Sequence, residues 1–271
     1  MERAAAEGFD PLWQGLRDRG RLGGRQVHFL AETDSTNDVA LALGRAGTRA
    51  GSLVVAESQN CGRGRLGRVW LSPSGCGIYC SLVLRPRLAP GDLAKITLAA
   101  GLGVAKAVEA VASLYPAIKW PNDLLLDGRK CGGILTEGGG FVFGQPLLVV
   151  VGIGLNVLTP QAAFPEELRQ RATSLYAHSG RPVSRGSLLV AMVEAVEGEV
   201  QRLERGGFAA VLAQWRQRDA VFGKRLAWLT PEGGVVEGVA LGPDDEGILH
   251  IRDDGGRVHE VLSGDLTLHQ K

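Results

Sequence analysis

The pattern of the chain changes at Phe222-Gly223, and this change constrains the fold more than any other feature. Before it, long apolar segments with helical spacing alternate with short β-type runs. After it, short strand-like runs separated by Gly-, Pro- and Asp-rich turns lie at about 225–230, 234–241, 247–252, 257–262 and 265–268. Five short strands in so few residues predict a small β-barrel. We therefore expect a first domain over residues 1–222 and a small β-barrel domain over residues 223–271.

The first part reads as an α+β domain with a mixed sheet flanked by helices. Apolar periodicity predicts helices at 11–19, 36–46, 92–115, 184–205 and 208–218. Shorter apolar runs predict strands at 52–57, 78–84, 117–120, 124–126, 129–135 and 147–157. Asp127-Gly128 predicts a tight hairpin between two of these strands. Ser35 with Asp38 three residues later fits a capping box at the start of the second helix.

Composition and the N-terminal sequence narrow the class of protein. Thirty basic residues against twenty-nine acidic ones leave a net charge of +1, which argues against a general polyanion binder but permits a local basic patch. No apolar run approaches the roughly 20 residues of a membrane span, and Met1–Arg25 has no signal-peptide core. We expect a soluble, cytoplasmic protein. About 27 residues precede the first strand, too few for a DNA-binding winged helix, and the four cysteines show no ligand spacing.

The segment Gly62-Arg63-Gly64-Arg65-Leu66-Gly67 matches the dinucleotide-binding pattern G-x-G-x-x-G. That reading fails because Pro and Gly follow where a helix should begin, and residues 82–91 lack the required acid. The segment instead offers Arg63, Arg65 and Arg68, with no acid between Ser58 and Arg85. Three guanidinium groups on a glycine-rich loop suit a triphosphate or an anionic intermediate. A solvated basic loop or a nucleic-acid-binding loop are the alternatives, with Trp70 and Tyr79 either stacking on bases or lying in the core.

Three further clusters combine unusual residues. They are Lys119-Trp120-Pro121-Asn122-Asp123, Arg129-Lys130-Cys131-Gly132-Gly133 and Gly152-Ile153-Gly154-Leu155-Asn156. Only six of the thirty basic residues are lysines, so a lysine kept inside a motif suggests a specific role. Lys130 could reach into a site, or it could be a solvated lysine at a strand edge. Glycines within a buried strand mark bulges or a ligand lying against the backbone.

Taken together with Glu32-Thr33-Asp34-Ser35-Thr36-Asn37 and the Gln59–Trp70 segment, these motifs resemble those of biotin protein ligase (biotin–[acetyl-CoA-carboxylase] ligase). The motifs occur in the order of that family, and the resemblance covers about 28–268. It implies a class II synthetase-like core with an SH3-like C-terminal barrel, in the ligase-only form without a DNA-binding domain. Leu66 departs from the often basic residue at its position in the loop.

The resemblance also implies roles for individual residues. The biotin-binding residues would be Ser35, Thr36, Asn37, Gln59, Gly62, Arg63, Gly64, Arg65, Trp70, Tyr79, Lys130, Gly133, Gly154 and Leu155. The residues binding ATP and the adenylate would be Arg65, Arg68, Trp70, Asn122, Lys130 and Asn156. The catalytic residues would be Lys130, Arg65 and Asp123.

The reaction implied is the ATP-dependent activation of biotin to biotinyl-5′-AMP, followed by transfer to a lysine of a biotin carboxyl carrier protein. Mg2+ would arrive with ATP, with Asp123 near it and no side-chain metal cage. Lys130 and Arg65 would offset the repulsion between carboxylate and phosphate. A homodimer is a family expectation, and neither DNA nor a membrane is expected as a partner. The alternatives are a lipoate or octanoyl transferase and a single-stranded nucleic-acid binder.

Overall fold

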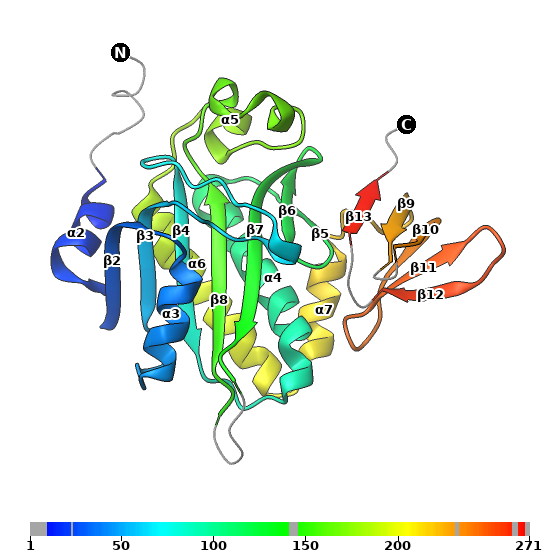
Figure 1. Ribbon diagram of the computed structural model, residues 1–271, viewed down its shortest axis with the longest axis horizontal. Helices are drawn as coiled ribbons and strands as arrows, with labels where there is room; N and C mark the ends of the chain where they lie inside the picture. The colour runs from blue at the N-terminus through cyan, green and yellow to red at the C-terminus, as the bar shows by residue number, and fades with distance from the viewer. Residues whose placement is uncertain (1–9, 23, 141–145, 231–232, 262–264, 269–271) are drawn as a thin grey trace.

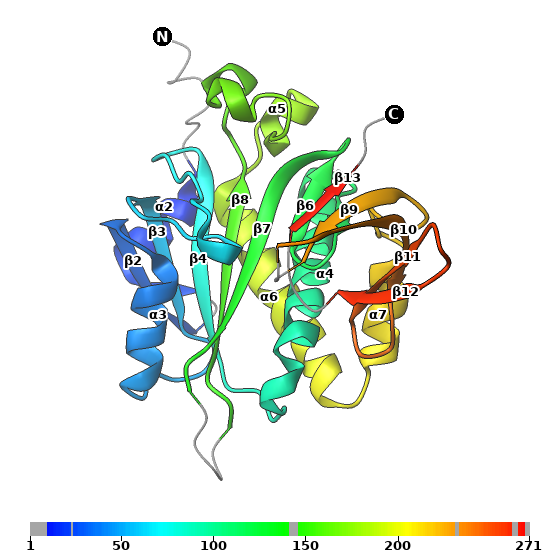
Figure 2. The same cartoon turned by 45° about the vertical axis from the view of Figure 1, so that its right-hand side comes forward.

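The computed structural model describes residues 10–22, 24–140, 146–230, 233–261 and 265–268. Its main feature is an eight-stranded sheet of order β1-β2-β3-β4-β8-β7-β6-β5 (Figure 1 and Figure 2). Only β2 and β3 pair in parallel, and every other neighbouring pair is antiparallel. The strands are β1 (Arg21–Leu22), β2 (Arg25–Thr33), β3 (Leu53–Gln59), β4 (Gly77–Leu84), β5 (Ala117–Lys119), β6 (Asp123–Leu126), β7 (Arg129–Gly138) and β8 (Val149–Asn156).

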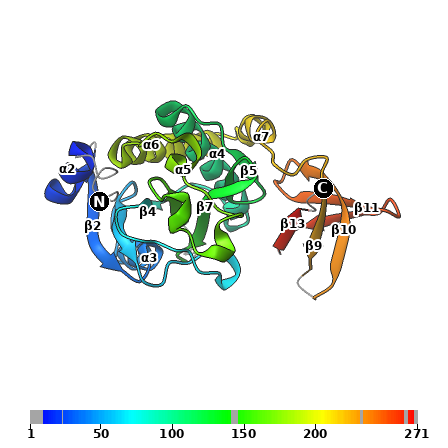
Figure 3. The same ribbon diagram turned by 90° about the horizontal axis from the view of Figure 1, so that it is seen from above.

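Helices cover both faces of this sheet. One face carries α4 (Leu93–Ala112), α6 (Arg185–Glu204) and α7 (Phe208–Arg216), while α3 (Thr36–Arg45) lies on the other (Figure 3). Helices α4 and α6 can approach closely at Gly103 because glycine has no side chain. A Cβ there would lie only 2.8 Å from the backbone of Val196. The helix α2 (Pro11–Arg19) packs beside β2, and the short helix α5 (Leu175–Ser179) follows β8. Among the described helices, none is both long enough and apolar enough to cross a membrane.

Local sequence explains most of these boundaries. Asp127 and Gly128 both have left-handed φ values, 46° and 76°, which form the predicted tight hairpin between β6 and β7. The side chain of Ser184 accepts a hydrogen bond from the Ser187 N–H and begins α6. The predicted capping box at Ser35 is wrong, because Ser35 makes no side-chain cap. Gln59 Oε1 accepts a hydrogen bond from the Thr36 N–H instead, at 2.9 Å.

The C-terminal strands form a separate five-stranded antiparallel sheet of order β12-β11-β10-β9-β13. They are β9 (Arg225–Leu229), β10 (Val235–Pro243), β11 (Leu249–Asp253), β12 (Val258–Val261) and β13 (Asp265–Leu268). This sheet confirms the predicted fold class, a mixed α+β core with a small all-β appendage. It contacts the larger part through the Trp120 indole N–H, which donates to Gly247 O at 2.9 Å, and through Lys119 Nζ, which donates to Leu266 O at 2.6 Å. The boundary at residue 222 stays a prediction.

Two Asp–His pairs in the small sheet predict a loss of stability in acid. Burial raises the pKa of Asp244, but hydrogen bonds from His250 and the backbone outweigh it and hold this pKa below its usual value. The hydrogen bond from His259 likewise lowers the pKa of Asp253. A lowered carboxyl pKa contributes stability above the unfolded-state pKa and loses it as pH falls through the folded-state pKa. We therefore expect the thermal midpoint to fall between about pH 5 and pH 2, and to fall less in Asp244→Asn. An equal acid dependence in that variant would contradict this assignment.

Candidate functional site

A cavity of about 740 Å3 lies over one face of the large sheet. Its walls come from the start of α3, the loop between β3 and β4, the turn between β5 and β6, and the segment after β8. Lys224, Leu266 and Thr267 extend this lining to the small C-terminal sheet. The described lining is strongly basic, with one carboxylate, Asp123, and seven cationic side chains: Arg63, Arg65, Arg68, Lys119, Lys130, Arg171 and Lys224. Such a lining favours an anionic ligand.

The arginine-rich loop, residues 62–70, folds back on itself like a hairpin. The Trp70 N–H donates to Gly62 O at 2.8 Å, and the Gly64 N–H donates to Arg68 O at 2.7 Å. A three-residue 3-10 turn, η1 (Arg65–Gly67), closes it, and Leu66 there has a left-handed φ of 56°. No α-helix starts at the glycine pattern, and β3 pairs antiparallel with β4. Both observations confirm that the dinucleotide-binding reading had to be rejected.

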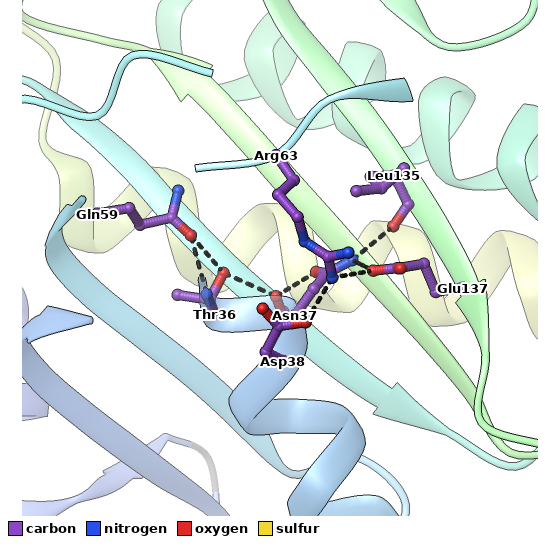
Figure 4. Close-up of polar contacts among 8 residues, drawn as sticks. Thr36, Asn37, Asp38, Gln59, Arg63, Leu135 and Glu137 are labelled. Atoms are coloured by element: carbon purple, nitrogen blue, oxygen red, sulfur yellow. Dashed lines mark hydrogen bonds and ion pairs between the residues drawn. The ribbon is translucent and has the colours of Figure 1, made fainter. Parts of the chain in front are cut away.

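A polar network connects the start of α3 to this loop (Figure 4). Gln59 Oε1 accepts from the N–H and the hydroxyl of Thr36, while Gln59 Nε2 donates to Ser72 Oγ at 2.8 Å. The Ser81 hydroxyl lies 2.6 Å from Asn37 Oδ1 and 2.8 Å from Thr36 Oγ1. These bonds fix the direction of the polar groups that α3 presents to the cavity.

Glycines form the floor of the cavity beneath this network. A Cβ on Gly152 would lie 2.1 Å from Asn37 Oδ1, and one on Gly154 would lie 2.5 Å from the Trp70 indole nitrogen. The Trp70 ring therefore rests directly on β8. Its Nε1 is buried against this strand and has no hydrogen-bond partner among the described residues. Gly133 on β7 lies under the same ring, with Trp70 Cζ3 3.5 Å from the position of a Cβ.

Lys130 lies where this floor meets the basic part of the cavity. Its Nζ is 2.6 Å from Asp123 Oδ1 and 5.4 Å from the centre of the Trp70 ring. A shift of register in the β6–β7 pairing, where Cys131 is the extra residue, turns Lys130 toward the cavity. The segment after β8 holds this backbone in place. The Lys130 N–H donates to Arg171 O at 2.8 Å, and the Thr173 N–H donates to Lys130 O at 2.9 Å.

The turn between β5 and β6 also contacts the arginine-rich loop. Arg65 Nη1 donates to Asn122 Oδ1 at 3.3 Å, and Asn122 Nδ2 donates to Ile134 O at 3.0 Å. Asn156 lines the cavity at the end of β8, with its Nδ2 donating to Thr173 O at 3.1 Å. Two motifs about 60 residues apart in sequence thus meet at the Arg65–Asn122 contact.

Asp123 is the one acidic side chain in the described lining, and no group of three His, Cys, Asp or Glu residues in the described ranges could hold a metal ion. Mg2+ is commonly bound by one or two carboxylates together with substrate phosphates. The lone carboxylate of Asp123 inside a basic cavity fits a metal that arrives bound to phosphate. It does not fit a resident metal held by protein ligands alone.

Most of the predicted site residues line this one cavity, and three do not. Gly62 is at the start of the loop and packs against its returning end, where a Cβ would be 2.4 Å from Trp70 O. Leu155 points into the core from the other face of β8, with no exposed surface. Tyr79 is also in the core, its hydroxyl donates to Pro73 O at 3.0 Å, and burial raises its pKa. Of the two open readings of Tyr79, base stacking or core, the structure selects the core.

Several lining residues were absent from the sequence predictions. They are in the segment from Ala163 to Ala172, including Arg171, and in the small sheet at Leu266 and Thr267, together with Lys224. These segments contain no motif that could have predicted them. The one related signal in the sequence was the Lys119-Trp120 cluster, whose side chains contact the small sheet in the structure.

Comparison with known proteins identifies the family. The profile of the Biotin/lipoate A/B protein ligase family matches residues 29–156. The chain is 36% identical over 250 residues to the biotin–[acetyl-CoA-carboxylase] ligase of Mycobacterium tuberculosis, covering 90% of each protein. The chain belongs to the biotin protein ligase family. This membership confirms the resemblance carried by the five motifs and the prediction of a ligase enzyme.

Further biotin protein ligases support the same placement. The bifunctional ligase/repressor BirA of Bacillus spizizenii is 35% identical, with 93% of this chain and 81% of that protein covered. A solved biotin protein ligase from Aquifex aeolicus, in complex with biotin and ATP, superposes with a TM-score of 0.77 at 30% identity. That match covers 90% of this chain and 99% of the other. The C-terminal sheet therefore belongs to the fold shared with this biotin protein ligase.

Proposed function

We propose that this protein activates biotin with ATP to biotinyl-5′-AMP and transfers the biotin to a lysine of a biotin carboxyl carrier protein. The observation that carries the proposal is the two-part chemistry of the cavity. One part has a glycine floor, at Thr36 and Gly152, and its nearby cation, Arg63, is paired with carboxylates. It continues into a strongly basic part around Lys130. This arrangement suits a small neutral ring system whose acidic tail meets a nucleotide triphosphate.

The part with the glycine floor suits the ureido ring of biotin. Ser35, Thr36 and Gln59 all line the cavity there, and the Thr36 and Gln59 side chains are held by each other. Fixed hydrogen-bonding groups recognise a ring amide because a wrong ligand leaves them unpaired.

The basic part suits the meeting of two anions. The carboxylate of biotin attacks the α-phosphate of ATP and displaces pyrophosphate, so the charge repulsion between the two anions has to be offset. Lys130 and Arg65 both line the cavity, Lys130 from β7 and Arg65 from the loop. A pair of unit charges about 4 Å apart is worth about 4 kcal/mol at an effective dielectric near 20. The Aquifex aeolicus biotin protein ligase, solved in complex with biotin and ATP, supports this pair of substrates.

The second step requires no protein nucleophile. The amine of the carrier lysine attacks the carbonyl of the mixed anhydride and AMP leaves, and Asp123, the one carboxylate of the described lining, would accept the proton. The carrier assignment follows the names of the relatives, which are biotin–[acetyl-CoA-carboxylase] ligases. Mg2+, the cytoplasmic location, the homodimer and the absence of DNA binding stay predictions.

Biotin-dependent exchange of pyrophosphate into ATP tests the first step. We expect exchange with biotin and little with lipoate. The lipoate reaction also tests the alternative that the protein is a lipoate or octanoyl transferase. Incorporation of biotin into an isolated carrier domain, with its target lysine replaced by arginine as the control, tests the second step. Absence of exchange with biotin would contradict the proposal, as would equal exchange with lipoate.

The variant Arg65→Gly should form the adenylate more slowly and release it early. It removes the guanidinium that donates to Asn122 and loosens a loop that already contains three glycines, at 62, 64 and 67. Charge-assisted hydrogen bonds lost from the adenylate are worth roughly 1.5–3 kcal/mol, or about 10- to 100-fold in its residence time. Free biotinyl-5′-AMP would then label lysines on added albumin, detected by blotting for biotin. No labelling despite measurable pyrophosphate release would overturn this role.

A further inference from the structure

Glu137 connects the helix start to the loop without lining the cavity. It is the residue before the end of β7, and its side chain is 25% exposed. Its Oε2 accepts from Asn37 Nδ2 at 2.6 Å and lies 3.0 Å from Arg63 Nη2 (Figure 4). One carboxylate oxygen therefore holds α3 and the loop at the same point.

Asn37 uses its amide within the protein. Its Oδ1 lies 2.6 Å from the Ser81 hydroxyl, and its Nδ2 donates to both Leu135 O and Glu137. An amide nitrogen has two hydrogens, and both have protein acceptors here. Asn37 is therefore placed to orient the start of α3 rather than to donate to a ligand, and Glu137 fixes the direction of that amide.

Arg63 attaches the loop to α3 and β7. Its guanidinium reaches Asp38 Oδ1 at 2.5 Å on α3 and Glu137 Oε2 on β7. The loop is thus held at two points, by Arg63 on this side and by Arg65 on Asn122. Asp38 is 57% exposed, so Glu137 is the better shielded of the two partners of Arg63.

We propose that Glu137 is a positioning residue that keeps the loop closed over the bound adenylate through Arg63 and orients the helix start through Asn37. This inference rests on the proposed adenylate-forming function. Glu137 does not line the cavity, so its loss should affect retention of the adenylate more than its formation.

The variants Glu137→Gln, Arg63→Gln and the double variant test this role. In Glu137→Gln the amide oxygen can still accept from Asn37, so the change removes the charge opposite Arg63 and little else. Glu237→Gln, which changes an exposed partner of Arg225 on the small sheet, is the matched control. Each protein is given biotin and ATP, and three quantities are measured: pyrophosphate release, dissociation of labelled adenylate, and the thermal midpoint.

We expect Glu137→Gln to release adenylate about 3- to 5-fold faster, as loss of a partly exposed ion pair allows. Pyrophosphate release on the first turnover should change less than about twofold, and the thermal midpoint should match that of Glu237→Gln. The double variant should release adenylate no faster than the faster single variant, because both changes remove one shared ion pair. Added salt should speed release from the unaltered protein and have less effect on Glu137→Gln.

Unchanged adenylate release in Glu137→Gln would overturn the proposal, and so would additive effects in the double variant. A lowered thermal midpoint with unchanged release would assign Glu137 to stability alone. Failure of the unaltered protein to release pyrophosphate with biotin would instead refute the proposed function, so the two failures are distinguishable.

Discussion

Lys130→Ala should slow adenylate formation by about a hundred- to a thousandfold, the range measured when one preorganised donor to a developing charge is removed. Lys130 Nζ is held 2.6 Å from Asp123 and lies beside the Trp70 ring, in the part of the cavity where the carboxylate and the α-phosphate would meet. Without it, a carboxylate and a polyphosphate must approach with Arg65 as the remaining charge of the catalytic pair. Single-turnover release of pyrophosphate, measured at saturating biotin and ATP, tests the expectation.

The variant Lys130→Arg serves as the matched control. It keeps the positive charge but replaces a compact ammonium by a planar guanidinium, so it should recover only part of the rate. Lys130→Ala should also leave added albumin unlabelled, because no adenylate forms that could escape. Labelling of albumin by Lys130→Ala, or adenylate formation within tenfold of the unaltered protein, would show that Lys130 does not act on the reacting groups.

Sequence alone predicted the parts of the site that depend on local pattern. The helix after Ser35, the hairpin at Asp127-Gly128 and the five short C-terminal strands all carry turn or periodicity signals that act over a few residues. Ordered motifs added the chemistry, since the arginine loop, Lys130 and Asn122 all line one cavity. The rejection of the dinucleotide fold also depended on local signals, the Pro and Gly that exclude a helix after Gly67.

Long-range pairing was not predictable in the same way. Glu137 is an ordinary acidic residue of β7 in the sequence, and only sheet pairing and helix packing place it between Asn37 and Arg63, 100 and 74 residues away. The capping box failed for the same reason: Ser35 makes no side-chain cap, and Gln59 from β3 instead accepts from the first N–H of the helix, that of Thr36. Tyr79, which lies near the loop motif in sequence, was predicted to bind biotin, but it is buried in the core. Nearness to a motif does not determine which face of a strand a residue occupies.

Gly152→Ala should weaken biotin binding by about a hundredfold or more, because the floor of the cavity has no room for a methyl group. The new Cβ would lie 2.1 Å from Asn37 Oδ1 and 2.8 Å from Asn37 Cγ. Asn37 cannot turn aside cheaply, because Ser81, Leu135 and Glu137 hold its amide. Forcing it away leaves buried donors and acceptors unpaired, at roughly 1–3 kcal/mol for each group.

Gly198→Ala is the matched control for this substitution and should act in the opposite direction. Gly198 lies in α6 with no atom within 4 Å of a new Cβ, so alanine there should stabilise the fold by roughly 0.5–1 kcal/mol and leave biotin binding unchanged. Titration calorimetry with biotin and thermal unfolding, applied to both variants, separate loss of the site from loss of the fold. Because Gly152 is central in β8, some loss of stability is expected, and the decisive quantity is biotin affinity measured well below the thermal midpoint. Near-normal affinity in Gly152→Ala would mean that Asn37 can move without cost, and that the start of α3 does not have to be held in place for biotin to bind.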